Sequence, residues 1–524
     1  MSSSSASSSS SPDDDLDIGD DDGADVLEPD GDDEGADNHD DGDDERADNL
    51  DPDGEACVAE DGGDMEYVAL LSPDEVPGLA DEPYTQTGPF CVDGDKQLIS
   101  WFQDARRRLT DEMRTVLADY FRVAKGTEGC TSVGTACSGT DVAVMVSRAF
   151  HTTFCQHSFV HSYSCEKDEK KRMFLQDLFE GELSCLFMDT CDLSKGSAQD
   201  VVTRSMRPVP PCTDFFAGFP CTDVSSLNPL APTSRDVIFC EDKRTGKVFN
   251  DCVHYLGKAH KDGLLELAIF ENVPGLAVAP KGTADPFTGR PHYSNLDHCV
   301  HKLGQIDLVT VAFTIDPRQF GWPVRRQRVW LISFPAKKLG EAGLSLDEVR
   351  RFAWSVMRRL VTNRLRNWDD LILPAHHPDV QAYTQECKDA GRAREAREAK
   401  MASSSKKQKL SKWPERNAKA FEKAGLDWWL PTVPNQAVFE THPTLHVLSE
   451  NMFDTLAFKG IAVPDSRPIA VDLSQAAARV SVGLHGVYPT VTPNGKLYRA
   501  DLARGFLGQD TCIPSSYLSY QTRH

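Results

Sequence analysis

The chain has 524 residues, of which 40% are hydrophobic, and a formal net charge of −25 that residues 1–66 contribute almost alone. Those residues hold 27 Asp and Glu against one basic residue, Arg46, so the remaining chain is nearly neutral and long enough for two or three domains. No apolar run is long enough to span a bilayer, and no basic segment precedes an apolar core at the N-terminus, so we expect a soluble, intracellular protein.

The acidic segment 1–66 begins with a serine run and continues in Asp, Gly and Ala, with almost no aromatic or branched apolar residues. Such a composition cannot offset the entropy of ordering, so we predict a disordered tail. We interpret it as a solvated appendage, with contact to chromatin as the alternative. Residues 67–98, which include four prolines, are predicted to form an extended linker.

The next segments alternate between strand and helix patterns. Helical spacing of apolar residues predicts one helix from Gln97 to about Ala124. Strands are then predicted at Val133–Ala136, Phe159–Ser164, Cys185–Met188, Asp214–Phe219, Leu264–Glu271, Leu308–Phe313 and Val329–Ser333, and helices at Asp141–Thr153, from Lys167, at Val248–Lys258, Leu296–Leu303 and Ser345–Val361. These repeated units predict an α/β fold with a doubly wound, mainly parallel sheet, whose ligands bind beyond the carboxyl ends of the strands.

The alternation stops after Phe334, and residues 362–440 are rich in Trp, Pro, His and basic residues. Within them, Lys388–Lys423 contains 12 Lys and Arg against 5 Asp and Glu. The flexible basic run Ser403–Lys412 is interpreted as a nuclear localisation signal, a loop that contacts phosphates, or an exposed charged insert. We predict a smaller, irregular domain at 362–465.

The 15 cysteines are scattered along the chain, without a Cys-x-x-Cys pair or a Cys/His group at zinc spacing. We therefore predict reduced, mostly buried thiols of a nuclear or cytosolic protein, and no metal site.

Two strand ends carry reactive side chains. Cys221 follows Gly-Phe-Pro where a predicted strand becomes a loop, which is where an α/β enzyme displays a nucleophile. Fifty residues later, Phe-Glu-Asn-Val-Pro places Glu271 at the end of the next strand. Taken alone, Cys221 is better interpreted as a buried core cysteine, and the alternative for Glu271 is a solvated carboxylate at a strand end. Together, a thiol and a carboxyl group on neighbouring strand ends can attack and protonate an aromatic ring.

The chain resembles the cytosine C5-methyltransferases in an ordered set of three motifs: Gly-Phe-Pro-Cys, then Glu-Asn-Val, then a late Arg-x-Arg. The resemblance covers roughly residues 130–335, and a weaker similarity follows at 468–510. Within this family the chain is most similar to divergent algal or protist members. It implies a Rossmann-like class I methyltransferase fold and DNA as partner, with the target cytosine flipped out of the stack. Cys221 matches the nucleophile that adds to cytosine C6, Glu271 matches the residue that protonates N3, and Arg326 and Arg328 match the late arginine motif. We expect the arginines to depress the pKa of the Cys221 thiol.

The resemblance also implies S-adenosyl-L-methionine as cofactor. Glu166 matches the acid that binds the ribose hydroxyls, and Asp189 matches the one that reaches the adenine amine, although an acid after a strand is commonly a helix cap. Cys137 stands where the family has an aromatic residue. The expected cofactor-binding residues are Cys137, Ser138, Gly139, Thr140, Glu166, Asp189 and Pro220.

We therefore predict a catalytic domain at 99–361, a target-recognition region at 362–465, and a C-terminal segment, 466–524, that returns to the catalytic domain. The family's Leu-Gln-Gly and terminal Gly-Asn-Ser motifs do not follow Gly508. The predicted function is methylation of cytosine C5 in DNA, in the nucleus, with the cytoplasm as the alternative. Methylation of tRNA cytosine and a catalytically silent binding or scaffold protein are the alternative functions.

Overall fold

A computed structural model describes most of the chain after residue 93. The acidic tail 1–66, nearly all of the linker 67–98 and the basic run 403–412 lie outside the described residues. The described ranges are 94–125, 129–155, 157–225, 237–239, 243–279, 293–361, 372–402, 413–423, 425, 442–462, 470–474, 482–483, 487–488, 496–499, 502 and 504–505.

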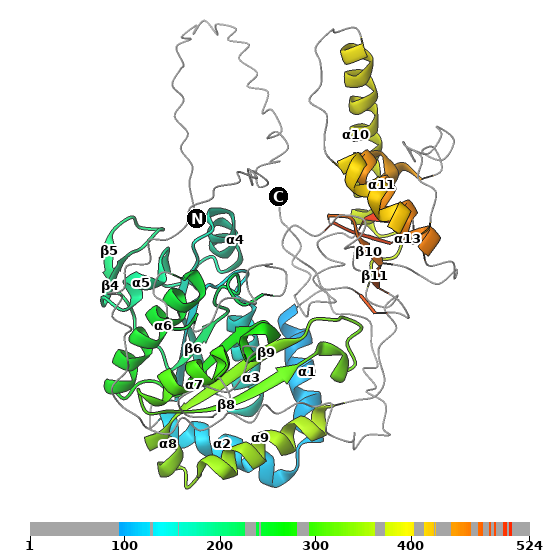
Figure 1. Cartoon of the computed structure of the whole chain (residues 1–524). Coiled ribbons are helices and arrows are strands. Elements are labelled where there is room, and N and C mark those ends of the chain that lie inside the picture. Colours follow the sequence, from blue (N-terminus) through cyan, green and yellow to red (C-terminus); the bar gives the residue numbers. More distant parts are fainter. Residues whose placement is uncertain are drawn as a thin grey trace, which may run out of the picture. The chain divides into compact units, whose positions relative to one another are not determined.

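A seven-stranded sheet with the order β3-β2-β1-β6-β7-β9-β8 forms the centre of the fold (Figure 1). The first five of these strands pair in parallel, whereas β9 is antiparallel to both of its neighbours. The strands are β1 (Cys130–Ala136), β2 (Ser158–Cys165), β3 (Leu186–Phe187), β6 (Asp214–Ala217), β7 (Leu267–Asn272), β8 (Leu308–Ile315) and β9 (Arg328–Pro335). The predicted Rossmann-like, mainly parallel sheet is confirmed.

Helices cover both faces of this sheet, because successive strand side chains point to opposite sides. Phe215 and Phe270 face a core built with Phe249 of α6, while Leu267 and Val311 face the other core. The first face is covered by α6 (Arg244–Lys261) and α7 (Asn295–Gly304). The second is covered by α1 (Gly94–Arg108), α2 (Asp111–Lys125), α3 (Val142–Phe154), α4 (Glu169–Leu178), α8 (Ala336–Glu341) and α9 (Leu346–Leu360).

The single helix predicted from Gln97 to Ala124 is wrong, because the chain breaks between α1 and α2. Thr110 stands at the break, and its hydroxyl accepts the backbone N–H of Met113 at 3.2 Å. A threonine that caps a helix in this way starts a new helix, and two acids follow it in the first turn. The other predicted strands and helices from Val133 to Val361 are present, with ends that differ by a few residues.

Two small elements between β3 and β6 are not predicted from the sequence. They are α5 (Thr190–Leu193) and the hairpin of β4 (Ser197–Gln199) with β5 (Met206–Pro208). The described cysteines are thiols rather than disulfides, as expected. Among the described helices, none combines the length and hydropathy needed to cross a membrane.

The described part of residues 372–462 is helical, and a small antiparallel sheet follows it. The backbone of Tyr488 bonds to the segment before Arg326: its carbonyl accepts the N–H of Arg325 at 3.0 Å, and its N–H donates to Pro323 at 2.7 Å. The elements are α10 (Pro378–Ala402), α11 (Trp413–Lys423), the 3₁₀ helix η6 (Pro443–Val447), α13 (Glu450–Ala462), and, in sheet order, β11 (Val482–Gly483), β10 (Ala470–Asp472), β12 (Leu497–Arg499) and β13 (Arg504–Gly505).

Candidate active site

Three loops leave the sheet side by side at its carboxyl edge. Ala217 at the end of β6 pairs with Ala136 at the end of β1 and with Phe270 near the end of β7. From β1 the chain continues to β2 in one direction along the sheet, and from β6 it continues to β7 in the opposite direction. The strand order therefore reverses between β1 and β6, and this is the switch point of the sheet. Ligands bind at such switch points in doubly wound sheets. The register therefore places the loops that begin at Cys137 and Gly218 around one site with Glu271, near the end of β7.

The loop after β6 holds Cys221 in a tight turn. The carbonyl of Cys221 accepts the N–H of Val224 at 3.1 Å and that of Ser225 at 2.9 Å. Asp223 and Thr245 then bond reciprocally: the N–H of Thr245 donates to the Asp223 carboxylate at 2.9 Å, and the N–H of Asp223 donates to the Thr245 hydroxyl at 3.3 Å. This pair fixes the loop to the first turn of α6.

A second set of contacts fixes the same loop to the strand that carries Glu271. The buried side chain of Asn272 donates to the carbonyl of Phe219 at 3.1 Å and accepts the N–H of Val273 at 2.8 Å. Gly275 packs against the carbonyl of Val224 so closely that an added Cβ would lie 1.9 Å from that oxygen. Sequence reasoning gave neither residue a role, although Asn272 stands within the quoted Glu-Asn-Val motif.

Glu271 forms an ion pair with Arg328, the first residue of β9. The Arg328 Nε lies 2.7 Å from Glu271 Oε1, and the two side chains are 17% and 25% exposed. Because β9 is antiparallel to β7, its first residue reaches the edge at which β7 ends. Gly218 keeps the space beside the carboxylate open, since an added Cβ would lie 3.5 Å from Glu271 Oε2. The structure thus brings together Glu271, Arg328 and the loop that carries Cys221, all of which the sequence predicts for the site.

The Cys221 thiol is half-buried, and burial is the largest influence on its pKa, which it raises. The charge of Arg328 lowers the pKa, that of Glu271 raises it, and that of Arg326 lowers it. The net pKa lies above the ordinary value. Both arginines lower this pKa, as expected, but the expected net depression is wrong for the chain alone, because burial outweighs the two positive charges. Burial and the charge of Arg326 in turn lower the pKa of Arg328. Both predicted arginines thus act on the nucleophile through charge.

The turn after β1 is bonded to the end of β2. Ser138 donates its N–H to the carbonyl of Cys165 at 3.1 Å, and its hydroxyl accepts the N–H of Cys165 at 3.0 Å. Cys137 and Gly139 have positive φ angles of 52° and 58°. An added Cβ at Gly139 would meet nothing within 4 Å, so the backbone faces open space there. Thr140 is exposed and makes no contact that defines the turn.

Glu166 links this turn to the loop after β2. One carboxylate oxygen accepts the N–H of Gly139 at 2.7 Å, and the other accepts the N–H of Asp168 at 2.9 Å. The side chain is only 7% exposed. Asp168, not Glu166, caps α4, so the helix-cap interpretation does not apply to Glu166. Burial raises the pKa of nearby Cys137 to about 12, and the charges of Glu166 and Asp189 add to that effect.

Asp189 does act as a helix cap. Its carboxylate accepts the N–H of Cys191 at 3.1 Å at the start of α5. Burial raises its pKa, but the hydrogen bonds from Cys191 and the charge of Lys167 outweigh burial and leave the pKa below its ordinary value. The structure thus groups Cys137, Glu166 and Asp189 on adjoining strand ends, and Pro220 is half-buried next to Cys221.

Asp141 supports the turn from beneath, a role that sequence reasoning missed. Its buried carboxylate accepts hydrogen bonds from the hydroxyls of Thr135, at 3.0 Å, and Ser164, and lies 3.4 Å from His161 Nε2. An aspartate that begins a helix usually caps it, but Asp141 has a φ of 55° and makes no side-chain cap bond to α3. The position of Asp141 directly before α3 is typical of a helix cap, but its carboxylate bonds to β1 and β2 instead.

No model of a protein family matches the chain. Among curated proteins, the chain is 27% identical over 213 residues to the DNA (cytosine-5-)-methyltransferase DMT5 of Cryptococcus neoformans var. grubii serotype A. The aligned residues make up 39% of this chain and 8% of that protein, so the chain spans a small part of the relative's length.

Solved structures that match part of the chain include methyltransferases. The S. pombe Dnmt2 methyltransferase is 14% identical, with a TM-score of 0.28 over 47% of this chain and 60% of that chain. A putative DNA modification methyltransferase encoded within an E. coli prophage is 15% identical, with a TM-score of 0.25 over 40% of this chain and 47% of that chain.

Proposed function

We propose that this chain, a relative of the cytosine-5 methyltransferases, transfers a methyl group from S-adenosyl-L-methionine to C5 of cytosine in DNA through a covalent bond between Cys221 and C6. The observation that carries the proposal is the group of Cys221, Glu271 and Arg328 at the carboxyl edge of the sheet. The neighbouring turn after β1 is open and donates a hydrogen bond from Gly139 to the buried Glu166. In this proposal Cys221 is the nucleophile, Glu271 carries the proton, and the turn after β1 receives the cofactor.

In the proposed reaction the Cys221 thiolate forms a bond to C6 of the flipped cytosine while Glu271 delivers a proton to N3. Addition at C6 displaces the electron pair of the C5–C6 double bond and converts the ring to an enamine, in which C5 is the nucleophilic carbon. After C5 is methylated, a base removes the C5 proton, the double bond re-forms and the C6–S bond breaks. Cys221 leaves as thiolate, the proton on N3 returns to Glu271, and the base passes the C5 proton to solvent, so the protein side chains are restored.

Arg328 holds Glu271 in place through their ion pair, and both arginines stabilise the negative charge on the attacking sulfur. The hydrogen bonds from Asn272, Asp223 and Thr245 hold the loop in one geometry before substrate arrives. Such preorganisation favours attack, because a displacement of about 1 Å from the reacting geometry can lower the rate by about 10²-fold.

The turn after β1 suits S-adenosyl-L-methionine. The open space beside Gly139 accommodates a ligand against the backbone, and the Glu166 carboxylate, already oriented by two amide donors, can accept further bonds from ribose hydroxyls. Asp189 stands at the next strand end for the adenine amine. When bound, the cofactor supplies the activated methyl group.

Trapping on DNA that contains 5-fluorocytosine tests the proposal. Fluorine replaces the C5 proton, so elimination fails and a covalent adduct of protein and DNA should accumulate only with cofactor and only with intact Cys221. A matched tRNA carrying the same base is the second arm of the experiment. Adduct on tRNA alone would refute the DNA substrate, and no cofactor binding by calorimetry with the folded full chain would refute the enzyme.

The rate of methylation should rise with pH from neutral until it reaches a plateau. The thiolate is the reactive form, and a raised pKa leaves most Cys221 protonated near neutral pH, so deprotonation increases the rate. Arg328→Gln should move the inflection to higher pH, because it removes a charge that lowers this pKa. Single-turnover rates against pH measure both effects, with the exposed Arg325→Gln as control. An inflection that Arg328→Gln leaves unmoved contradicts this electrostatic role.

Replacing Glu166 by alanine should weaken cofactor binding by about 10–100-fold, the effect of losing one or two charge-assisted hydrogen bonds. The turn also loses the acceptor of the Gly139 amide. Isothermal titration with S-adenosyl-L-methionine measures the change, and the exposed Glu169→Ala on α4 is the control. An unchanged dissociation constant in Glu166→Ala would remove this residue from the cofactor site.

A further inference from the structure

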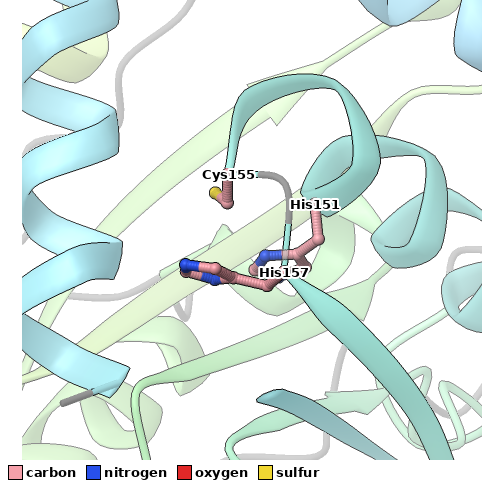
Figure 2. A group of neighbouring side chains, drawn as sticks. All are labelled: His151, Cys155 and His157. Atoms are coloured by element: carbon pink, nitrogen blue, oxygen red, sulfur yellow. The ribbon is translucent and has the colours of Figure 1, made fainter. Parts of the chain in front are cut away.

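A group of metal-binding side chains lies where α3 ends and β2 begins. His151, Cys155 and His157 each place one ligand atom within 4.8 Å of the others. Figure 2 shows the three side chains turned toward one another, from the last turn of α3 and the segment that leads into β2. His151 is buried and the other two are half-buried. Because β2 begins here, the group lies at the amino edge of the sheet, opposite to Cys221.

The donor set is typical of zinc. Two imidazole nitrogens and one thiolate are ligands that Zn²⁺ prefers, and three protein ligands with water complete a tetrahedron. Zinc binds nitrogen at about 2.0–2.1 Å and sulfur at about 2.3 Å, which places tetrahedral ligand atoms roughly 3.3–3.8 Å apart. Small side-chain rotations therefore close the observed group around an ion.

A buried carboxylate orients the first of these ligands. Asp214 Oδ2 lies 2.8 Å from His151 Nε2, and both side chains are at most 1% exposed. The hydroxyl of Thr213 donates to the same carboxylate at 3.2 Å, which holds it in place. Metal-binding histidines usually donate their other ring N–H to such a carboxylate. An Nε2–H that donates to Asp214 would leave Nδ1 as the nitrogen that binds the metal.

The backbone holds the other two ligands close to the first. His151 and Cys155 stand four residues apart on one helix face, and the N–H of Cys155 donates to the carbonyl of His151 at 3.0 Å. The chain then reverses into β2, which brings His157 back beside the helix end, with its ring stacked on His151 at 6.3 Å between centroids.

We propose that His151, Cys155 and His157 form a zinc site, oriented by Asp214, that fastens the end of α3 to the start of β2. This site is independent of the proposed methyl transfer. The prediction of no metal site overlooked it because the spacing His-x₃-Cys-x-His lacks the paired pattern of common zinc motifs. The group forms only when the helix end and the chain reversal are combined.

Zinc content of the full chain tests the site directly. Chain produced with added zinc and then desalted should carry one equivalent more zinc than the double variant Cys155→Ala/His157→Gln. Cys130→Ala is the matched control, because Cys130 is also half-buried, and it should keep the zinc. Equal zinc in wild type and double variant overturns the proposal.

A second measurement needs no variant, so a folding defect cannot obscure it. Cobalt(II) replacing zinc should give the absorption of a tetrahedral site with a thiolate-to-metal charge-transfer band. Peptide-level alkylation should find Cys155 protected in the zinc-loaded chain and reactive after chelation, with Cys130 reactivity unchanged by metal. A cobalt spectrum without the thiolate band, or Cys155 labelling that zinc does not alter, would refute the site.

Discussion

Replacing Cys221 by serine should lower the single-turnover rate of methyl transfer to DNA by roughly 10³-fold or more. A serine hydroxyl is ionised far less readily than a thiol, so the bond to C6 does not form at a useful rate. Cofactor affinity should stay within about threefold of wild type, since the proposed cofactor contacts come mainly from the loops after β1, β2 and β3. Transfer of a labelled methyl group and calorimetric titration measure the two quantities separately.

The half-buried Cys130→Ser, at the start of β1, serves as a control for loss of a thiol elsewhere on the chain. It should retain most of the rate, and it should still form the adduct with 5-fluorocytosine DNA. If Cys221→Ser retained normal turnover, another residue would be the nucleophile and the proposed mechanism would be wrong.

Replacing Gly275 by alanine should reduce the methylation rate by about 100-fold through displacement of the Cys221 loop. The new Cβ would lie 1.9 Å from the carbonyl oxygen of Val224, well inside the closest approach of such atoms, so one backbone must move by about an ångström. The free energy of unfolding should fall by about 1–3 kcal/mol, as in other overpacked sites.

Gly340→Ala is the matched control, because an added Cβ there meets nothing within 4 Å. Denaturant unfolding and single-turnover kinetics on both variants separate the loss of stability from the loss of rate. Cofactor affinity should change little, since the cofactor turn lies on other strands. A Gly275→Ala variant with wild-type rate and stability would show that this contact does not position the loop.

The strands and the reactive pair were predictable from local sequence, because buried parallel strands have a strong apolar signature and strand ends display their loop residues. Cys221 and Glu271 therefore fell at the carboxyl ends of two strands that pair in parallel. The domain limits stay predictions. The break between α1 and α2 was missed because apolar spacing continues across Thr110, while a single side-chain cap decides where the second helix begins.

The electrostatics of the site could not be read from the sequence. Two nearby arginines suggested a depressed pKa for Cys221, whereas burial of the thiol outweighs both charges. Burial depends on the packing of the whole loop, which no local motif reports. For the same reason, the hydrogen bonds of the buried Asp141 carboxylate and the proximity of His151 to His157 could be found only in the folded chain.

The reversed direction of β9 has a consequence for how the site tolerates change in the chain. In a purely parallel sheet, only residues beyond the end of a strand reach the carboxyl edge, and their position depends on loop length. Arg328 instead lies within a ladder, paired with Ile315 on one side and next to the pairing of Val329 with Asn272 on the other. Hydrogen-bond register, not loop closure, therefore sets its distance to Glu271. Insertions between residues 316 and 327 can lengthen that connection without moving the guanidinium.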